Sequence, residues 1–175
     1  MHIPIDFKAQ SGYYMYSGFL YTNEENGGSD MSRKAAREVA VHIVYDYGFN
    51  NEIGEESLQH FLSEEFAESV SGDTDIYSQV GKGQHKYIET VVKGVSEKRE
   101  EIDELIRKYS VGWNLNRISR IAMAVMRVAV FESKYTDEVS EKIAINEAVE
   151  IAKKYDTAET VSFINGILGS IVREG

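Results

Sequence analysis

The sequence predicts an all-α protein, a compact bundle of about seven helices. The chain of 175 residues contains 1 proline, and proline is the residue that breaks helices most strongly. From residue 32 onward, apolar residues recur every three or four positions, as they do along one face of an α-helix. No stretch alternates apolar and polar residues for long enough to indicate a strand.

The first 30 residues differ from the rest of the chain. They contain the only proline, several tyrosines and glycines and no helical periodicity, and they end in the linker-like sequence NEENGGSD. We predict that residues 1–30 form a flexible N-terminal extension or leader, and that residues 31–175 form one helical domain. A domain of this size can bury a substantial core.

The first two helices of this domain are predicted from apolar spacing and from capping residues. Ser32 is suited to capping the first helix and Gly48 to ending it. The apolar face between them consists of Ala36, Ala40, Ile43 and Tyr47. A second helix is predicted over residues 55–69, with one face formed by Leu58, Phe61, Leu62 and Phe66. The segment SGDTD then interrupts the pattern.

Five further helices are predicted in the remainder of the domain. The sequence GKGQ forms a turn before a helix at residues 87–95, and the next helix lies at residues 102–109. Residues 118–131 are almost entirely apolar, which places that helix at the centre of the bundle. Ser140 is predicted to cap a helix over residues 142–155, and Asp156 or Thr157 a last helix over residues 158–174.

Composition excludes several classes of function. The chain has no cysteine, so disulfides, thiolate metal sites and cysteine nucleophiles are excluded, and a reducing cytoplasm is the expected compartment. No apolar run approaches the roughly 20 residues that cross a bilayer, and the N-terminus lacks a secretion signal. A net charge of −10 argues against general nucleic-acid binding, although a local basic patch can still bind.

Catalytic and metal-binding signatures are also missing from the sequence. The four histidines are scattered without metal-ligand spacing. The GKG at residues 81–83 lacks the spacing and the following hydroxyl of a phosphate loop. Carboxylates occur in runs such as EKREEIDE, which are typical of solvated helix faces. We therefore predict a protein that is not an enzyme and that has no cofactor and no metal.

Positive charge gathers in one place, the stretch MSRKAAREVAVHIVY at residues 31–45. Arg33 and Arg37 are four residues apart and share a helix face, with Lys34 beside them. The same row continues through Val41 to Tyr45, which is a plausible footprint for phosphates and a stacked base of single-stranded RNA. The alternative is a set of solvated cations, although positive charge at a helix N-terminus costs about 0.3–1 kcal/mol per charge.

The second half of the chain carries motifs of a known family. The run WNLNRISRIAMAVMRVAVFE is followed by KIAINEAVEIAKKY and then by SFINGILGSI. These segments, in this order and at this separation, resemble the transcription antitermination factor NusB family, with its W-x-L-x-R, A-x-x-R-x-A, A-I-N-E-A and F-x-N-G motifs. Upstream, YIETVVKGV is similar to the family's Y-x-x-x-L-V-x-G-V helix. The resemblance covers residues 31–175.

This resemblance implies a cytoplasmic bacterial RNA-binding adaptor with the seven-helix NusB fold. Members pair with NusE, a small-subunit ribosomal protein, and bind the boxA element of nascent transcripts, notably ribosomal RNA leaders, within an RNA polymerase antitermination complex. The residues expected at the RNA by this resemblance are Arg33, Lys34, Arg37, Thr160, Val161 and Phe163. Tyr45 and Ala122 are expected at the partner interface, where Ala122 replaces a commonly acidic residue, and Thr160 stands where aspartate is frequent.

Other motif residues are predicted to be structural. Asn146 and Asn165 are expected to be buried helical amides that satisfy neighbouring polar groups. Gly166 is expected to permit close helix packing, and Trp113 to lie in the core. Phe163 is compatible with both a stacking platform and a core residue.

Two alternative functions are compatible with the sequence. NusB-like domains also precede ribosomal RNA cytosine methyltransferases, and a G-x-G-x-G-bearing cofactor domain downstream in the gene would favour that interpretation. The other alternative is a helical protein–protein interaction module without RNA affinity. A homodimer is possible as well, since homodimers occur among relatives.

Overall fold

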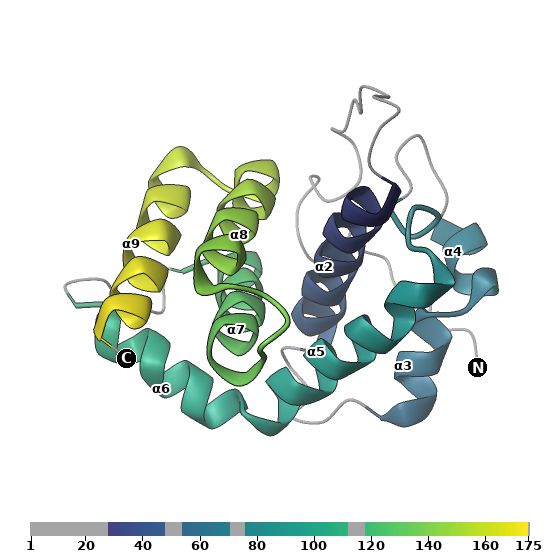
Figure 1. The fold of residues 1–175 in the computed structure, drawn as a ribbon, viewed down its shortest axis with the longest axis horizontal. Coiled ribbons are helices and arrows are strands. Elements are labelled where there is room, and N and C mark those ends of the chain that lie inside the picture. The colour runs from purple at the N-terminus through teal and green to yellow at the C-terminus, as the bar shows by residue number, and fades with distance from the viewer. Residues whose placement is uncertain (1–27, 48–53, 71–75, 112–117, 175) are drawn as a thin grey trace.

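The computed structural model describes residues 28–47, 54–70, 76–111 and 118–174, and within these ranges it contains eight α-helices and no strand (Figure 1). The all-α prediction is therefore confirmed. The helices are α2 (Gly28–Tyr47), α3 (Glu55–Phe61), α4 (Glu64–Val70), α5 (His85–Glu97), α6 (Arg99–Tyr109), α7 (Arg120–Tyr135), α8 (Glu141–Tyr155) and α9 (Ala158–Glu174). A short 3-10 turn, η1 (Lys82–Gln84), precedes α5 where GKGQ predicts a turn.

Helix α2 begins at Gly28, four residues before the predicted cap. Ser32 therefore lies inside the helix, and the prediction that it caps the helix is wrong. Residues 28–31 include no proline, the residue that most strongly disfavours a helix. The end of the predicted linker thus joins the helix.

The predicted helix over residues 55–69 is two helices, α3 and α4. The break lies at Ser63, whose hydroxyl oxygen accepts a hydrogen bond of 3.1 Å from the Phe66 amide and so caps α4. The same hydroxyl donates to the His60 carbonyl at 2.7 Å. Phe61 and Phe66 then pack with ring centroids 4.8 Å apart. Ser63 therefore separates α3 from α4, while the apolar face of the predicted helix continues through both.

Side-chain caps fix the start of the last three helices. Ser119 accepts from the Ala122 amide at 3.1 Å, and Ser140 accepts from the Ile143 amide at 3.4 Å as predicted. Thr157, rather than Asp156, caps α9, since its hydroxyl accepts from the Thr160 amide at 3.2 Å. Capping of this kind satisfies amides that have no partner within the helix.

Helix α7 is the centre of the bundle, as its apolar sequence predicts. It packs against α2, α5, α6, α8 and α9. Buried side chains occupy both of its faces, from Ile121 to Glu132, and Glu132 is the polar member of this set. No helix among the described residues is long and apolar enough to cross a membrane.

Candidate nucleic-acid interface

Arg33 lies in the second turn of α2, at the edge of the bundle. Its guanidinium carbon is 4.2 Å from the centre of the Tyr87 ring of α5, a cation–π arrangement. Its Nη1 is 3.4 Å from Oε2 of Glu138, in the α7–α8 connection. The side chain is 34% exposed, so the guanidinium is held in place by the ring and still accessible from solvent.

Lys34 lies beside Arg33 on α2 and is more exposed. Its Nζ is 3.9 Å from Oε1 of Glu147 on α8. At this distance the contact is a loose, partly solvent-screened ion pair. Arg33 and Lys34 together form the exposed part of the predicted basic cluster, and we call them the α2 cation pair.

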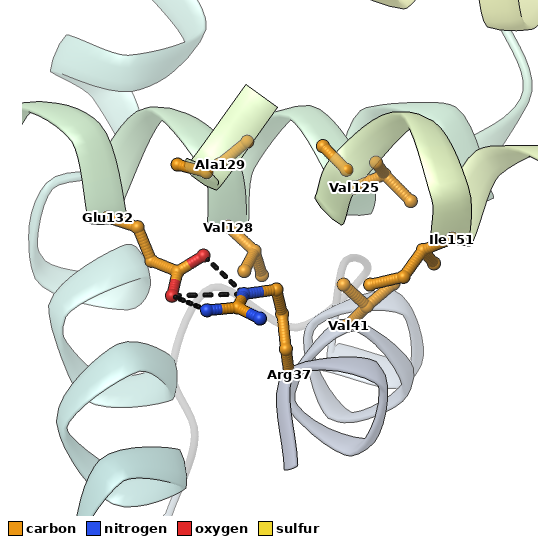
Figure 2. Close-up of a pocket in the computed structure, with 9 residues that line it drawn as sticks. Arg37, Val41, Val125, Val128, Ala129, Glu132 and Ile151 are labelled. Carbon is orange, nitrogen blue, oxygen red and sulfur yellow. Dashed lines mark hydrogen bonds and ion pairs between the residues drawn. The ribbon is translucent and has the colours of Figure 1, made fainter. Parts of the chain in front are cut away.

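Arg37 is buried, which corrects the prediction that it lies on the surface beside them. Its Nε donates to the two carboxylate oxygens of Glu132 at 2.8 and 3.1 Å, and its Nη2 donates to Oε1 at 3.0 Å. Figure 2 shows the Arg37 side chain extending from α2 toward Glu132 on α7. Arg37 is 3% exposed and Glu132 is fully buried, so this guanidinium offers no surface to an RNA phosphate.

Two further side chains complete the cluster around Arg37. The Tyr87 hydroxyl donates to Oε1 of Glu132 at 2.6 Å, and Nη1 of Arg37 lies 3.5 Å from Oε2 of Glu147. Burial lowers the pKa of Arg37, but the hydrogen bonds to Glu132 and the nearby negative charges outweigh it and leave that pKa above its ordinary value. Burial and the charge of Glu132 raise the pKa of Tyr87 well above the ordinary value of a tyrosine, so its hydroxyl stays protonated. The cluster is therefore a fixed set of charges that ties together α2, α5, α7 and α8.

The predicted stripe along α2 turns inward for a geometric reason. Steps of four residues advance about 40° around a helix of 3.6 residues per turn. The row therefore rotates from partly exposed Arg33 through buried Arg37 and Val41, and it ends at Tyr45, which is half-buried and packed against the core. A continuous surface stripe of cations leading to an aromatic ring does not exist on this helix.

The predicted RNA contacts on α9 lie on another part of the molecule. Phe163 is 7% exposed and belongs to the core cluster, while Thr160 and Val161 are half-buried. Phe163 also lines an open groove of about 530 Å³ that includes Tyr109 of α6 and Ser162 of α9. Helices α7 and α8 lie between α2 and α9 (Figure 1), so the structure does not bring the two sets of predicted RNA residues together.

Several other predicted residues lie elsewhere than expected. Ala122 is 1% exposed in the core of α7 and cannot contact a partner directly. Asn146 and Asn165 are exposed on α8 and α9, because each faces away from the apolar side of its helix, so neither is a buried amide. A Cβ added to Gly166 would meet nothing within 4 Å, which excludes close helix packing there. Trp113 lies outside the described residues.

The prediction of Arg33, Lys34 and Arg37 did not include their partners, which are Tyr87, Glu132, Glu138 and Glu147. One of them carried a signal in the sequence. Glu132 directly follows a long apolar run in the predicted central helix, and a carboxylate in that position needs a buried cation. The part of the chain with described side chains contains no group of three or more histidines and carboxylates that could hold a metal ion.

Comparison with known proteins identifies the family. The model of the NusB family matches residues 34–173. The chain belongs to the NusB family. It is 38% identical to the transcription antitermination protein NusB of Acetivibrio thermocellus over 143 residues, which are 82% of this chain and 90% of that protein. It is 32% identical to the protein of the same name from Clostridium botulinum, over 81% of this chain and all of that protein (100%).

Solved NusB structures share the fold. T. maritima NusB superposes with a TM-score of 0.64 at 27% identity, over 81% of this chain and 91% of that one. A chain in the crystal structure of the antitermination factors NusB and NusE in complex with double-stranded RNA superposes with a TM-score of 0.65 at 22% identity, over 82% and 98% of the two chains. The predicted NusB-like fold is thus confirmed.

Proposed function

We propose that this protein is a cytoplasmic transcription antitermination factor that binds RNA through the α2 cation pair, Arg33 and Lys34. Membership of the NusB family supports the class of function. The placement of two partly exposed cations on one turn of α2, one of them held over the Tyr87 ring, supports the site. This placement is the single observation that carries the proposal.

The two cations suit phosphate recognition in different ways. A guanidinium presents a planar fork of donors that binds phosphate oxygens in pairs, and stacking on Tyr87 restricts it before RNA arrives. The Lys34 ammonium is a point charge that tolerates several phosphate positions. Such contacts position an RNA backbone, and they carry no sequence information by themselves.

Sequence selection is therefore assigned to other parts of an assembly. We propose that the RNA is a boxA-type element of ribosomal RNA transcripts, and that a NusE-type ribosomal protein binds together with it within an RNA polymerase antitermination complex. The solved assembly of NusB with NusE and RNA supports this partner set. Tyr45, which is half-buried on α2, is proposed for the partner side. Thr160, Val161 and the groove beside Phe163 are proposed as a second, separate RNA contact.

The test is fluorescence anisotropy of a labelled boxA-like RNA, titrated with the protein in the presence and absence of NusE. The Arg33→Ala and Lys34→Ala variants should each weaken binding about tenfold and reduce the slope of log affinity against log salt by roughly 0.7. The matched control is Lys98→Ala. Lys98 also lies over a tyrosine ring, 5.6 Å from the centre of Tyr135, and also pairs with a carboxylate, at 2.9 Å from Glu101.

The control variant should bind RNA as the wild type does, because Lys98 lies at the α5–α6 junction. Equal losses in all three variants would instead indicate a general effect of net charge. Binding to NusE without any RNA affinity would point to a protein–protein interaction module.

A further inference from the structure

We propose that Glu138 and Glu147 set the RNA affinity of this protein by occupying Arg33 and Lys34 as internal counter-ions. The inference rests on the proposed RNA-binding function of the α2 cation pair. Both carboxylates come from segments distant in sequence, Glu138 from the α7–α8 connection and Glu147 from α8. An incoming phosphate has to compete with them for the same donors.

The contacts of the two carboxylates differ in strength. Glu138 is 68% exposed and touches Arg33 at 3.4 Å, so it can swing into solvent at little cost. Glu147 is 13% exposed and lies between two cations, 3.5 Å from Nη1 of Arg37 and 3.9 Å from Nζ of Lys34. Its contact with buried Arg37 holds it in place. Phosphate can therefore displace Glu138 from Arg33, whereas Lys34 remains close to the negative charge of Glu147.

Each cation in this region has an acidic neighbour among the described residues. The cations are Arg33, Lys34 and Arg37, and the carboxylates that contact them include Glu138, Glu147 and Glu132. An approaching phosphate therefore meets cations whose charge is already partly offset. The α2 cation pair attracts RNA more strongly only as Glu138 moves away or Glu147 is shared.

These internal ion pairs also affect the salt dependence of RNA binding. RNA binding to a free cation releases about 0.7 counter-ions per phosphate from a single strand. A carboxylate displaced from its internal partner takes up a counter-ion in return, which lowers the net release. The wild-type protein should therefore show a shallower salt slope than the number of its cations implies.

The experiment measures affinity for the boxA-like RNA with Glu138→Gln, Glu147→Gln and the double variant. Each substitution keeps the shape of the side chain and removes its charge. Glu138→Gln should tighten binding about twofold to fivefold, as expected for an exposed ion pair. Glu147→Gln should tighten it roughly fivefold to twentyfold, since its pair is less screened by solvent. Each should also steepen the salt slope by up to about 0.7.

Two control variants change the net charge by the same amount. Glu150 lies one turn further along α8 and pairs with Lys153 at 2.6 Å, so Glu150→Gln frees Lys153 from this contact. Glu104→Gln lies on the exposed side of α6. Both should leave the affinity within about twofold of the wild type, because long-range charge effects are screened at physiological salt. Thermal melts of all variants establish that each is folded at the temperature of the titration.

The outcomes separate this inference from the proposed function. If the wild type binds RNA and the Glu138 and Glu147 variants bind no tighter than the controls, the counter-ion inference is overturned and the RNA-binding function stands. If all four single variants bind tighter by the same factor, net charge explains the gain and the inference is again overturned. If neither the wild type nor the double variant binds RNA, both are overturned. A gain confined to the Glu138 and Glu147 variants supports the inference.

Discussion

Arg37 of α2 and Glu132 of α7 form a forked ion pair in the centre of the bundle, with N–O distances of 2.8 to 3.1 Å. Their side chains are 4% and 1% exposed. Removing two charges from water is costly, and only close geometry with further hydrogen bonds compensates for it. Tyr87 and Glu147 supply those further contacts, which makes the pair a fixed junction between helices.

Breaking this ion pair should strongly destabilise the fold. We expect Arg37→Ala to lower the free energy of unfolding by about 3–5 kcal/mol, because it leaves the Glu132 carboxylate buried without its partner. Urea denaturation followed by circular dichroism measures the change. The exposed pair of Lys98 and Glu101 is the control, and Lys98→Ala should cost about 1 kcal/mol or less.

The double substitution Arg37→Met with Glu132→Leu tests the same electrostatic explanation by removing both charges together. It replaces the pair with apolar side chains of similar volume and should recover most of the lost stability. A double variant as unstable as Arg37→Ala would contradict the electrostatic explanation and would indicate that the loss comes from packing.

Gly94 of α5 is required by the close approach of Phe131. A Cβ at Gly94 would clash with the Phe131 ring, whereas a Cβ at Gly166 or Gly169 of α9 would meet nothing within 4 Å. We expect Gly94→Ala to lower the free energy of unfolding by about 1–3 kcal/mol through overpacking. Gly166→Ala should instead raise it by about 0.5–1 kcal/mol, because alanine favours a helix more than glycine does.

Chemical denaturation of both variants checks this prediction. A second substitution, Phe131→Leu, should reduce the cost of Gly94→Ala by making room for the new methyl group. Equal effects of alanine at positions 94 and 166 would show that helix propensity, and not the Phe131 ring, decides the residue at position 94.

Ser119 joins the start of α7 to the end of α8. Its hydroxyl accepts from the Ala122 amide at 3.1 Å and donates to the Asp156 carboxylate. We expect Ser119→Ala to lower the free energy of unfolding by about 1–2 kcal/mol, since it removes a cap and a charge-assisted hydrogen bond together. Ser140→Ala, which removes a weaker cap of 3.4 Å, should cost less. Thermal unfolding compares the two variants, and a larger loss in Ser140→Ala would contradict the prediction.

His42 should make the fold sensitive to acid. It is 1% exposed, its Nε2 is 3.0 Å from the Tyr155 hydroxyl, and burial lowers its pKa to about 4 despite the opposing charge of Glu38. The unfolded chain binds a proton near pH 6.5 and the folded protein does not, so stability is lost as pH falls from 6.5 toward 4. Between pH 7 and 5 the loss from this group is about 2 kcal/mol.

Denaturation of the wild type and of His42→Gln at pH 7, 6 and 5 isolates this contribution. The difference in unfolding free energy between the two proteins should shrink as pH falls. Asp46, one turn further along α2, should give a pH dependence of stability with the opposite sign. Burial raises the pKa of Asp46 to about 7, so the folded protein loses stability as pH rises toward 7. In that range the free energy of unfolding of Asp46→Asn should rise relative to that of the wild type. A parallel pH dependence in all three proteins would contradict both assignments.

The sequence by itself determined the helices and the identity of the central one. Periodicity is a local property, so the spacing of apolar residues and the capping residues located α5 to α9. The same local information predicted one helix at residues 55–69, because the apolar face continues through the break. The cap made by Ser63 became visible only in three dimensions.

The sequence also identified the basic turn of α2, but it did not distinguish its members. Arg33 and Arg37 are the same residue type on the same helix, one turn apart. One is stacked on Tyr87 near the surface, and the other is buried against Glu132. The tertiary structure decided this difference, because the partners that select each position come from α5, α7 and α8, about 50 to 110 residues away. Whether a charged side chain is buried depends on which opposite charge the fold brings beside it. Helical spacing is a local pattern, so it does not predict contacts between residues that are far apart in the sequence.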